Sequence, residues 1–315
     1  MELSQIAPDV YACLQPDTGF GASNSGFVNR GGGLVVDTLY DLPRTRRLID
    51  LYATVASDPA SRLVNTHHNG DHCWGNQIFA ELGTEIIGHR LCAEWFRREA
   101  TPELFVALCE ADDVPPPYEG LARALRAFDF HDIVLTPPTT LIDGETDLDL
   151  DGLLVRLLYV GPAHTPGDVV VHLPDEGIVF TGDILFHRCT PIGWEGTFDN
   201  WVGALRRLEA LDPAVIVPGH GPLADTAGLR ELRHYLEYVR DEARRCFDAG
   251  LTTLEAAGRI DLGPYGLWTE PERLAFQLDR AYRELSGVAW DEPVDTAKVF
   301  GEMAALRDRY SATPI

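Results

Sequence analysis

The chain has little positive charge and no long apolar run. Of its 315 residues, 49 are acidic and 26 are basic, which gives a formal net charge of −23, and Lys298 is the single lysine. A nucleic-acid-binding protein needs positive charge to meet the phosphates, so a nucleic-acid partner is not expected. Strongly anionic substrates are also disfavoured, unless a metal concentrates positive charge at the site. No apolar run reaches the roughly 20 residues that span a membrane, so no membrane partner is expected either.

The sequence also lacks paired cysteines and a secretory signal. Its six cysteines are scattered and form no C-x-x-C pair, which indicates free thiols in a reducing compartment and not a structural zinc site. The first residues, Met1 to Gln5, show no basic region followed by an apolar core. The predicted location is therefore cytoplasmic.

Strand and helix patterns alternate over much of the chain, which predicts a layered α/β fold. A helix is expected over about 42–56, and Gly31 to Gly33 read as a hairpin turn, because no Lys-Ser/Thr tail of a phosphate loop follows. The strands that we predict after residue 40 are 62–66, 84–88, 133–135, 146–150, 153–160, 168–172, 177–181 and 215–218.

Two segments have helical patterns instead. Residues 89–130 read as a helical insertion, with a helix start at Thr101, and the chain is helical again from 226 to its end. Residues 252–255 and 269–272 both fit the capping box. We predict a domain over 1–225, with the insertion at about 89–130, and a C-terminal helical extension over 226–315 packed on it. Whether the insertion caps a site or only covers the fold is left open.

Imidazole and carboxylate side chains follow several of the predicted strands. The run from His67 to His72 follows one strand, and His164, Asp183 and His220 each follow another. These are ligand types that zinc and related metals bind, and loops after strands are where a layered α/β protein carries its site. The pattern predicts one metal site assembled from four separate segments.

These segments resemble, in order and in local sequence, the signatures of the metallo-β-lactamase superfamily. They read His-His-Asn-Gly-Asp-His at 67–72, Gly-Pro-Ala-His-Thr-Pro-Gly at 161–167, Phe-Thr-Gly-Asp at 180–183 and Pro-Gly-His-Gly at 218–221. The resemblance covers about residues 9–225. It implies an αββα sandwich of two mixed β-sheets with the metal site at one edge, to which this chain adds the helical insertion and the C-terminal helical extension.

The resemblance also implies the ligand set. One metal would be held by His67, Asn69 and His164, a second by Asp71, His72 and His220, and Asp183 would bridge them. An aspartate at the bridging position is similar to the thioesterase, lactonase and phosphodiesterase members and not to the true β-lactamases. The implied cofactor is Zn²⁺, as one or two ions, with iron or manganese as alternatives.

The first segment departs from the H-x-H-x-D-H signature, because Asn69 stands where the family has its second histidine. A neutral amide oxygen is a weaker ligand for zinc than an imidazole. We therefore predict that the site of Asp71, His72 and His220 fills first and more tightly. Three outcomes stay open: one metal, two metals with Asn69 as a weak ligand, or two metals with water in place of the missing imidazole.

Other residues near these segments receive supporting roles. His68 occupies a spacer position of the family pattern and is predicted to be a pocket histidine in preference to a ligand. Asp37 is expected to support the metal loop, and His187 to line the pocket. Five aromatic residues form either an apolar pocket wall or part of the core, with equal weight: Trp74, Phe186, Trp194, Phe198 and Trp201.

The resemblance implies a metallo-hydrolase that uses metal-bound hydroxide on an ester, thioester, lactone or amide of a small organic substrate. The candidate catalytic residues are Asp71, as proton acceptor, and His68 and Asn69, as donors to a developing oxyanion. One alternative is a metal-dependent lyase, cyclase or iron oxygenase. A non-catalytic binding protein is disfavoured by six intact ligand positions of seven. The expected partner is a small-molecule substrate, and a homodimer is left open.

Overall fold

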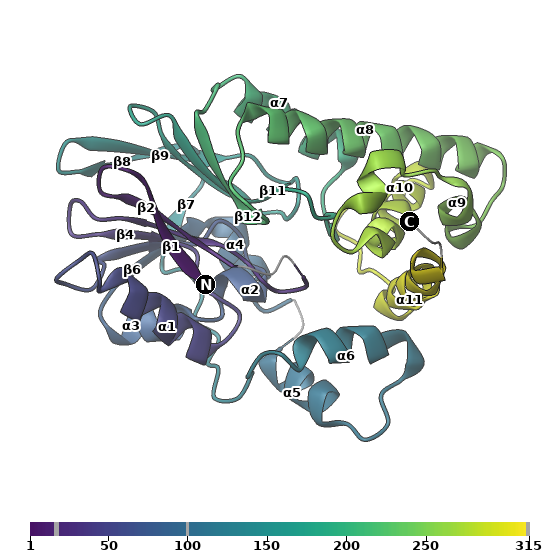
Figure 1. The fold of residues 1–315 in the computed structure, drawn as a ribbon, viewed down its shortest axis with the longest axis horizontal. Helices are drawn as coiled ribbons and strands as arrows, with labels where there is room; N and C mark the ends of the chain where they lie inside the picture. The colour runs from purple at the N-terminus through teal and green to yellow at the C-terminus, as the bar shows by residue number, and fades with distance from the viewer. Residues whose placement is uncertain (16–18, 99–100, 313–315) are drawn as a thin grey trace.

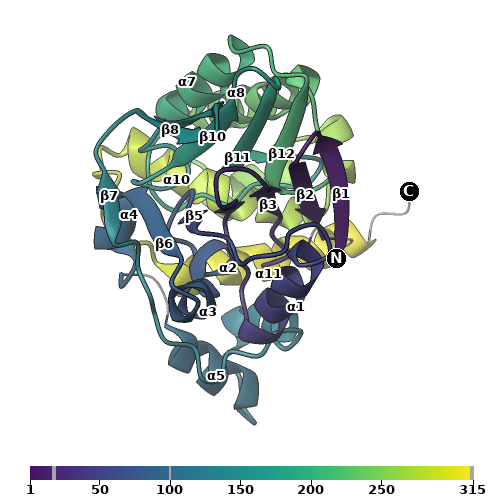
Figure 2. The same ribbon diagram turned by 90° about the vertical axis from the view of Figure 1, so that its left-hand side faces the viewer.

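The computed structural model describes residues 1–15, 19–98 and 101–312, and two stacked β-sheets with helices on their outer faces make up its centre (Figures 1 and 2). This is the αββα sandwich of two mixed sheets that the sequence predicted. All six cysteines are free thiols, as expected. Among the described residues, none of the helices combines the length and the apolar character that crossing a membrane would need.

The first sheet comes from the N-terminal part of the chain and keeps its seven strands in chain order. Neighbouring strands are antiparallel from β1 to β4 and parallel from β4 to β7. The hairpin between β3 and β4 contains Gly31, Gly32 and Gly33, all with positive φ, which confirms the predicted turn. The strands are β1 (Glu2–Ala7), β2 (Val10–Leu14), β3 (Ser25–Val28), β4 (Leu34–Val36), β5 (Arg62–Val64), β6 (Glu85–His89) and β7 (Thr140–Ile142).

The second sheet has five strands in the order β12-β11-β10-β9-β8. All its neighbours are antiparallel except β11 and β12, which run parallel and so bring their carboxyl ends to the same edge. The strands are β8 (Thr146–Leu150), β9 (Leu153–Tyr159), β10 (Val169–Leu173), β11 (Ile178–Phe186) and β12 (Val215–His220).

The facing sides of the two sheets share one apolar core. Val36 and Val64 of the first sheet and Val171 and Phe180 of the second are at most 3 % exposed. Burying one such side chain contributes roughly 1.5–3 kcal/mol, so this core holds the sheets face to face. The sheets come so close that a Cβ on Gly26 would lie 2.2 Å from the Phe180 ring.

Helices cover both outer faces. Helices α1 (Leu42–Tyr52) and α3 (Asn76–Glu81) lie against the first sheet, and α7 (Phe198–Glu209) and α8 (Thr226–Asp248) lie along the second. The short helix α2 (Gly70–Cys73) sits within the histidine-rich segment itself. Helices α1, α7 and α8 each begin at a capped residue, as α7 does at Thr197, whose side chain accepts a hydrogen bond from the Asn200 amide.

The insertion and the C-terminal extension meet through the last helix. The insertion contains α4 (Arg90–Trp95), α5 (Pro102–Glu110), η1 (Pro116–Tyr118) and α6 (Glu119–Leu125), and the extension adds α9 (Thr253–Arg259), η2 (Gly263–Leu267), η3 (Pro271–Arg273), α10 (Leu274–Leu285) and α11 (Thr296–Ala312). Helix α11 contacts both η1 and α10, and the hydroxyls of Tyr118 and Thr296 lie 3.0 Å apart. The predicted helix start at Thr101 and capping box at Thr252 are confirmed.

Two local predictions are wrong. Residues 133–135 form no strand: Asp132 turns the chain at φ 60, Ile133 is buried in the core, and Val134 is 65 % exposed and bonds through its backbone to Gln77 of α3. No capping box forms at 269–272 either. The backbone of Thr269 instead bonds to Arg188 and Thr190, and Glu270, which precedes a proline, takes a left-handed conformation. Strand β1 was not anticipated at all.

Candidate metal centre

Histidine and aspartate side chains from both sheets converge at the edge where β5, β11 and β12 end. His67 to His72 follow β5, His164 lies in the loop between β9 and β10, and His220 is the last residue of β12. Asp183 was expected just beyond a strand, but β11 continues through it to Phe186, with an irregular register against β12 on either side. The structure thus brings together all seven residues that the sequence suggested.

The first group of side chains, here called the His67 half, is His67, Asn69 and His164. His67 Nε2 lies 3.8 Å and His164 Nε2 lies 3.4 Å from Asp183 Oδ2. The amide oxygen of Asn69 is 2.8 Å from His164 Nε2. The substituted residue therefore points into the cluster, at the place where the family signature would put an imidazole.

The second group, here called the Asp71 half, is Asp71, His72 and His220. His220 Nε2 lies 3.3 Å from Asp71 Oδ2 and 3.4 Å from His72 Nε2. Asp183 stands between the halves, with Oδ1 at 3.1 Å from His72 Nε2 and Oδ2 at 3.3 Å from His220 Nε2. A Cβ at Gly219 would lie only 1.9 Å from Asp183 Oδ1, so glycine is required for β12 to pass this carboxylate.

All four imidazoles are anchored by Nδ1 and point Nε2 into the cluster. His72 Nδ1 lies 2.9 Å from Asp37 Oδ2, His164 Nδ1 lies 2.9 Å from the Ile192 carbonyl, and His220 Nδ1 lies 3.2 Å from the Ala22 carbonyl. These acceptors require a proton on Nδ1, so Nε2 is the nitrogen that can face a metal.

His67 is anchored through Thr66. The Thr66 hydroxyl donates to Asp37 Oδ2 at 2.7 Å, so its own oxygen is free to accept from His67 Nδ1 at 2.9 Å. Asp37 therefore supports both His67 and His72, in the supporting role that the sequence suggested. Its backbone is left-handed, with φ 60.

The residues present fit a bound cation. His67 Nε2 is buried and has no hydrogen-bond partner among the described residues. Burial, which removes the imidazoles from water, lowers the pKa of His67 well below its usual value and that of His164 to about 4. Burial would also lower the pKa of His220, but Asp183 and Asp71 raise it to about 9. Converging lone pairs and buried carboxylates that attract positive charge are what a divalent metal site requires.

The cluster is reached from one side. The side chain of Asp71 is 14 % exposed, whereas those of the four imidazoles and Asp183 are at most 5 % exposed. Asn69 is 7 % exposed as a residue. A reacting group would therefore approach over Asp71 and Asn69.

His68 does not join the cluster. None of the groups of His and Asp side chains that could hold a metal, among the described residues, includes it. Its ring lies 6.1 Å from that of Trp95, and burial lowers its pKa to about 3. The structure thus brings this candidate catalytic residue beside the loop but not among the inward-facing groups.

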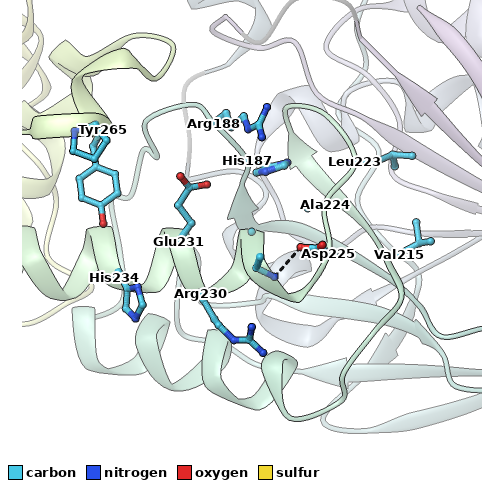
Figure 3. A pocket seen from close by; sticks show the side chains of 13 residues that line it. His187, Arg188, Val215, Leu223, Ala224, Asp225, Arg230, Glu231, His234 and Tyr265 are labelled. Atoms are coloured by element: carbon cyan, nitrogen blue, oxygen red, sulfur yellow. Dashed lines mark hydrogen bonds between the residues drawn. The ribbon is translucent and has the colours of Figure 1, made fainter.

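His187 lines a different hollow from the one expected. It borders a surface pocket of about 840 Å³ with Arg188, Glu231 and Tyr265 (Figure 3). Its Nδ1 lies 2.9 Å from the Pro222 carbonyl, and its backbone N–H donates to the His220 carbonyl. The pocket therefore backs onto the main chain of His220 and not onto its imidazole.

The five aromatic residues are mostly core. Phe186 stacks on the His220 ring, with centroids 5.0 Å apart and planes at 8°, and Trp201 lies 5.4 Å from the His164 ring. Both are at most 2 % exposed. Phe198 and Trp74 are also buried, at 1 % and 3 %, and among the five only Trp194 is partly exposed. Phe186 and Trp201 pack behind the imidazoles of His220 and His164, whereas Trp74 packs against Tyr40, Phe105 and Phe130.

Sequence reasoning missed the backbone and side-chain partners that fix the metal-binding loops. The Asn24 side chain donates to the carbonyls of Pro218 and Gly221, at 3.0 and 2.8 Å, and so brackets His220. Ile192 supplies only its carbonyl to His164. Neither contact leaves a sequence signal, because each depends on how distant segments meet and not on a local pattern.

Residues 18–220 match the sequence model of the metallo-beta-lactamase superfamily. The chain belongs to the metallo-β-lactamase superfamily. A metallo-beta-lactamase type 2 from Bacteroides fragilis is 33 % identical over 249 residues, which are 76 % of this chain and 85 % of that protein. A linear primary-alkylsulfatase from a Pseudomonas species is 23 % identical over 269 residues, 74 % of this chain and 49 % of that protein. The family resemblance inferred from the sequence is thereby confirmed.

Solved structures show the same fold. The inverting sec-alkylsulfatase Pisa1 from Pseudomonas sp. has a TM-score of 0.67 at 17 % identity, over 93 % of this chain and 51 % of that one. A metallo-β-lactamase family protein from Thermus thermophilus has a TM-score of 0.65 at 21 % identity, over 90 % and 95 %. The chain spans about half the length of the first curated relatives it matches. Its buried His/Asp cluster contains groups of side chains that could hold a metal ion.

Proposed function

We propose that this protein is a metal-dependent hydrolase that cleaves an ester, thioester, lactone or amide bond of a small organic substrate. The observation that carries the proposal is the cluster of four inward-facing Nε2 atoms around Asp183, each imidazole anchored through Nδ1. Zinc is the proposed metal, because imidazole and carboxylate are its usual ligands. When bound, such an ion lowers the pKa of a coordinated water to near 7 and supplies a nucleophile at neutral pH.

The chain's own residues have separate tasks in this proposal. Asp71 is the most accessible member of the cluster, so it is positioned to accept a proton from the attacking water. Asn69, whose amide oxygen faces His164, can present its amide group to the oxygen on which negative charge develops. The other cluster members are buried and act by holding charge and geometry in place. His68, directed toward Trp95, is left without a direct catalytic task.

Asn69 decides how many metals the cluster holds. His164 donates through Nδ1, so its Nε2 and the Asn69 oxygen, 2.8 Å apart, are two acceptors facing each other. Such a pair repels unless a cation lies between them or the amide turns to donate its NH₂ group. The first arrangement makes Asn69 a weak metal ligand, and the second closes the His67 half. In both, we expect the Asp71 half to bind metal more tightly.

Hydrolysis of an alkyl sulfate ester is the second candidate. It is supported by the similarity to the linear primary-alkylsulfatase, which extends over 74 % of this chain. The surplus of acidic residues weighs against an anionic substrate, so the carbonyl substrates come first. An iron oxygenase, lyase or cyclase is the third alternative, and iron in the purified protein would favour it.

The test is a substrate panel on protein purified without chelator or an affinity metal. The panel contains an aryl ester, a thioester, a lactone, an amide and a linear alkyl sulfate, each assayed with wild type and with Asp183→Ala and His220→Ala. We expect turnover of at least one carbonyl substrate in wild type and loss of both metal and turnover in the variants. Full activity in either variant would contradict the proposed metal-dependent hydrolysis. Turnover of the alkyl sulfate alone would favour the second candidate.

A further inference from the structure

Helix α10 of the C-terminal extension carries a row of buried polar side chains that face the fold. Arg273, at its start, and Gln277 and Arg280 within it are 2 %, 0 % and 3 % exposed. Positions separated by four and three residues share one face of a helix. Burying polar or charged groups is costly unless they are hydrogen-bonded, so the partners of this row indicate its purpose. The helix lies beyond residues 18–220, which match the superfamily.

The row donates to backbone carbonyls of two loops. Arg273 Nη1 donates to Thr190 at 3.1 Å and Gln277 Nε2 donates to Pro191 at 3.0 Å. Arg280 Nη2 donates to Ala163 at 2.7 Å. Three successive inward positions of the helix thus hold the loop after β11 and the loop between β9 and β10.

Both loops determine the position of His164. The next residue after Pro191, Ile192, accepts from His164 Nδ1 at 2.9 Å. Ala163 immediately precedes His164, and while its carbonyl is held by Arg280, its amide donates to Asp168 at 3.1 Å. Gln277 therefore holds the residue next to Ile192, whose carbonyl anchors His164. Arg280 holds the residue next to His164 itself.

We propose that Gln277 and Arg280 are positioning residues for the metal centre: through the carbonyls of Pro191 and Ala163 they fix His164 so that its Nε2 faces the cluster. The inference rests on the proposed role of His164 as a ligand. The C-terminal extension would then help to orient a residue of the His67 half, although the superfamily match ends before the extension begins. The Asp71 half has no such contact from α10 among the described residues, since its imidazoles are anchored on Asp37 and Ala22.

A packing role and a positioning role predict different results. If α10 only packs, its variants lower the stability of the whole protein and leave the local environment of His164 unchanged in the folded molecules. If it positions His164, its variants loosen the hydrogen bond from His164 Nδ1 and weaken metal binding in one half only. The test must therefore measure the hydrogen bond of His164 Nδ1 itself.

The variants are Gln277→Met and Arg280→Met, which remove the donors, and Arg280→Lys, which keeps a donor. The matched control is Arg307→Met, which breaks the 2.7 Å ion pair with Glu272 in the same extension, on a side chain that reaches neither loop. The first measurement is ¹⁵N-histidine NMR of the full-length metal-free protein, with the Nδ1–H signal of His164 assigned by its loss in His164→Ala.

We expect exchange of this proton with solvent to rise by about tenfold or more in both Met variants, less in Arg280→Lys, and not in the control. The second measurement is zinc titration of the same proteins against a competing chelator. The variant His164→Ala identifies the zinc-binding step that depends on this histidine. We expect the zinc affinity of that step to fall by about 10- to 100-fold in the Met variants, as for loss of an outer partner of a ligand. Unchanged proton exchange, or equal weakening in Arg307→Met, would overturn the inference. If His164→Ala itself alters no binding step, the ligand assignment fails instead, and the proton exchange still reports the positioning contact.

Discussion

The two halves of the cluster share an architecture and differ in charge. In both, each imidazole is held by Nδ1 and directs Nε2 toward Asp183. In the Asp71 half, the surrounding carboxylates overcome the effect of burial and raise the pKa of His72 and His220. In the His67 half, burial prevails and lowers the pKa of His67 and His164. One side of the site attracts positive charge strongly, and the other does so weakly.

The difference follows from a few residues and not from the scaffold. Asp71 places a second carboxylate beside Asp183 in one half, whereas Asn69 supplies only an amide to the other. Asp37 adds a carboxylate partner to His72, and such a partner raises the basicity of an imidazole ligand.

The largest effect is expected at Asp183, because it serves both halves. Asp183→Ala should remove metal binding from the whole cluster and lower activity by more than about 100-fold, since losing a ligand exceeds the 10- to 100-fold cost of losing an outer partner. Metal content and turnover of the same preparation test this. The control is Asp175→Ala, an exposed residue in the turn before β11, which should keep both.

A comparison of one histidine from each half measures the difference in zinc affinity between the two halves. His220→Ala should remove the tighter zinc-binding step, and His164→Ala should weaken only the second, weaker step. Competition titrations with a chelator of known affinity distinguish the two. Equal losses in the two variants would mean that the halves are equivalent and that Asn69 is as good a ligand as a histidine.

A moderate effect is expected at Asp37. Asp37→Asn keeps the shape of the side chain but removes the charge that supports His72, so zinc affinity of the Asp71 half should fall by about 10- to 100-fold. Asp9→Asn is the control, because Asp9 shares the left-handed backbone but is exposed in the β1–β2 turn. Zinc affinity that is unchanged in Asp37→Asn would show that the hydrogen bond to His72 does not tune the metal.

The smallest effect is expected at His68. Its ring is buried against Trp95 and outside the cluster, so His68→Phe should change zinc affinity by less than roughly threefold, far below the loss for a ligand. Turnover measured alongside separates two roles. A large loss of activity at constant metal content would restore His68 as a catalytic residue.

The fold and the seven clustered residues were predicted from local sequence patterns and from the family resemblance that these patterns carry. Apolar strands such as 62–66 and 215–218 end at His67 and close to His220, and strand ends of one sheet edge must meet in space. The segment 133–135 shows the limit of this reasoning. Its three apolar residues read as a strand, but the backbone of Val134 bonds to the side chain of Gln77 and only Ile133 is buried in the core.

The anchors of the site could not be predicted, because they are made by tertiary contacts. Ile192 contributes a carbonyl that every residue has, and Gln277 reaches the loop from a helix more than eighty positions later. The aromatic residues gave the right neighbourhood but left two roles open, and burial decides between them: Trp201 is 0 % exposed and packs behind His164.

The claim that the two halves bind metal unequally is tested most directly by the metal content per chain. Elemental analysis would measure it on wild type and on Asn69→His, both purified without chelator or an affinity metal. We expect about one zinc in wild type and about two in the variant, because an imidazole completes the His67 half. Two zinc ions in both proteins, or one in both, would contradict the claim that Asn69 sets the difference between the halves.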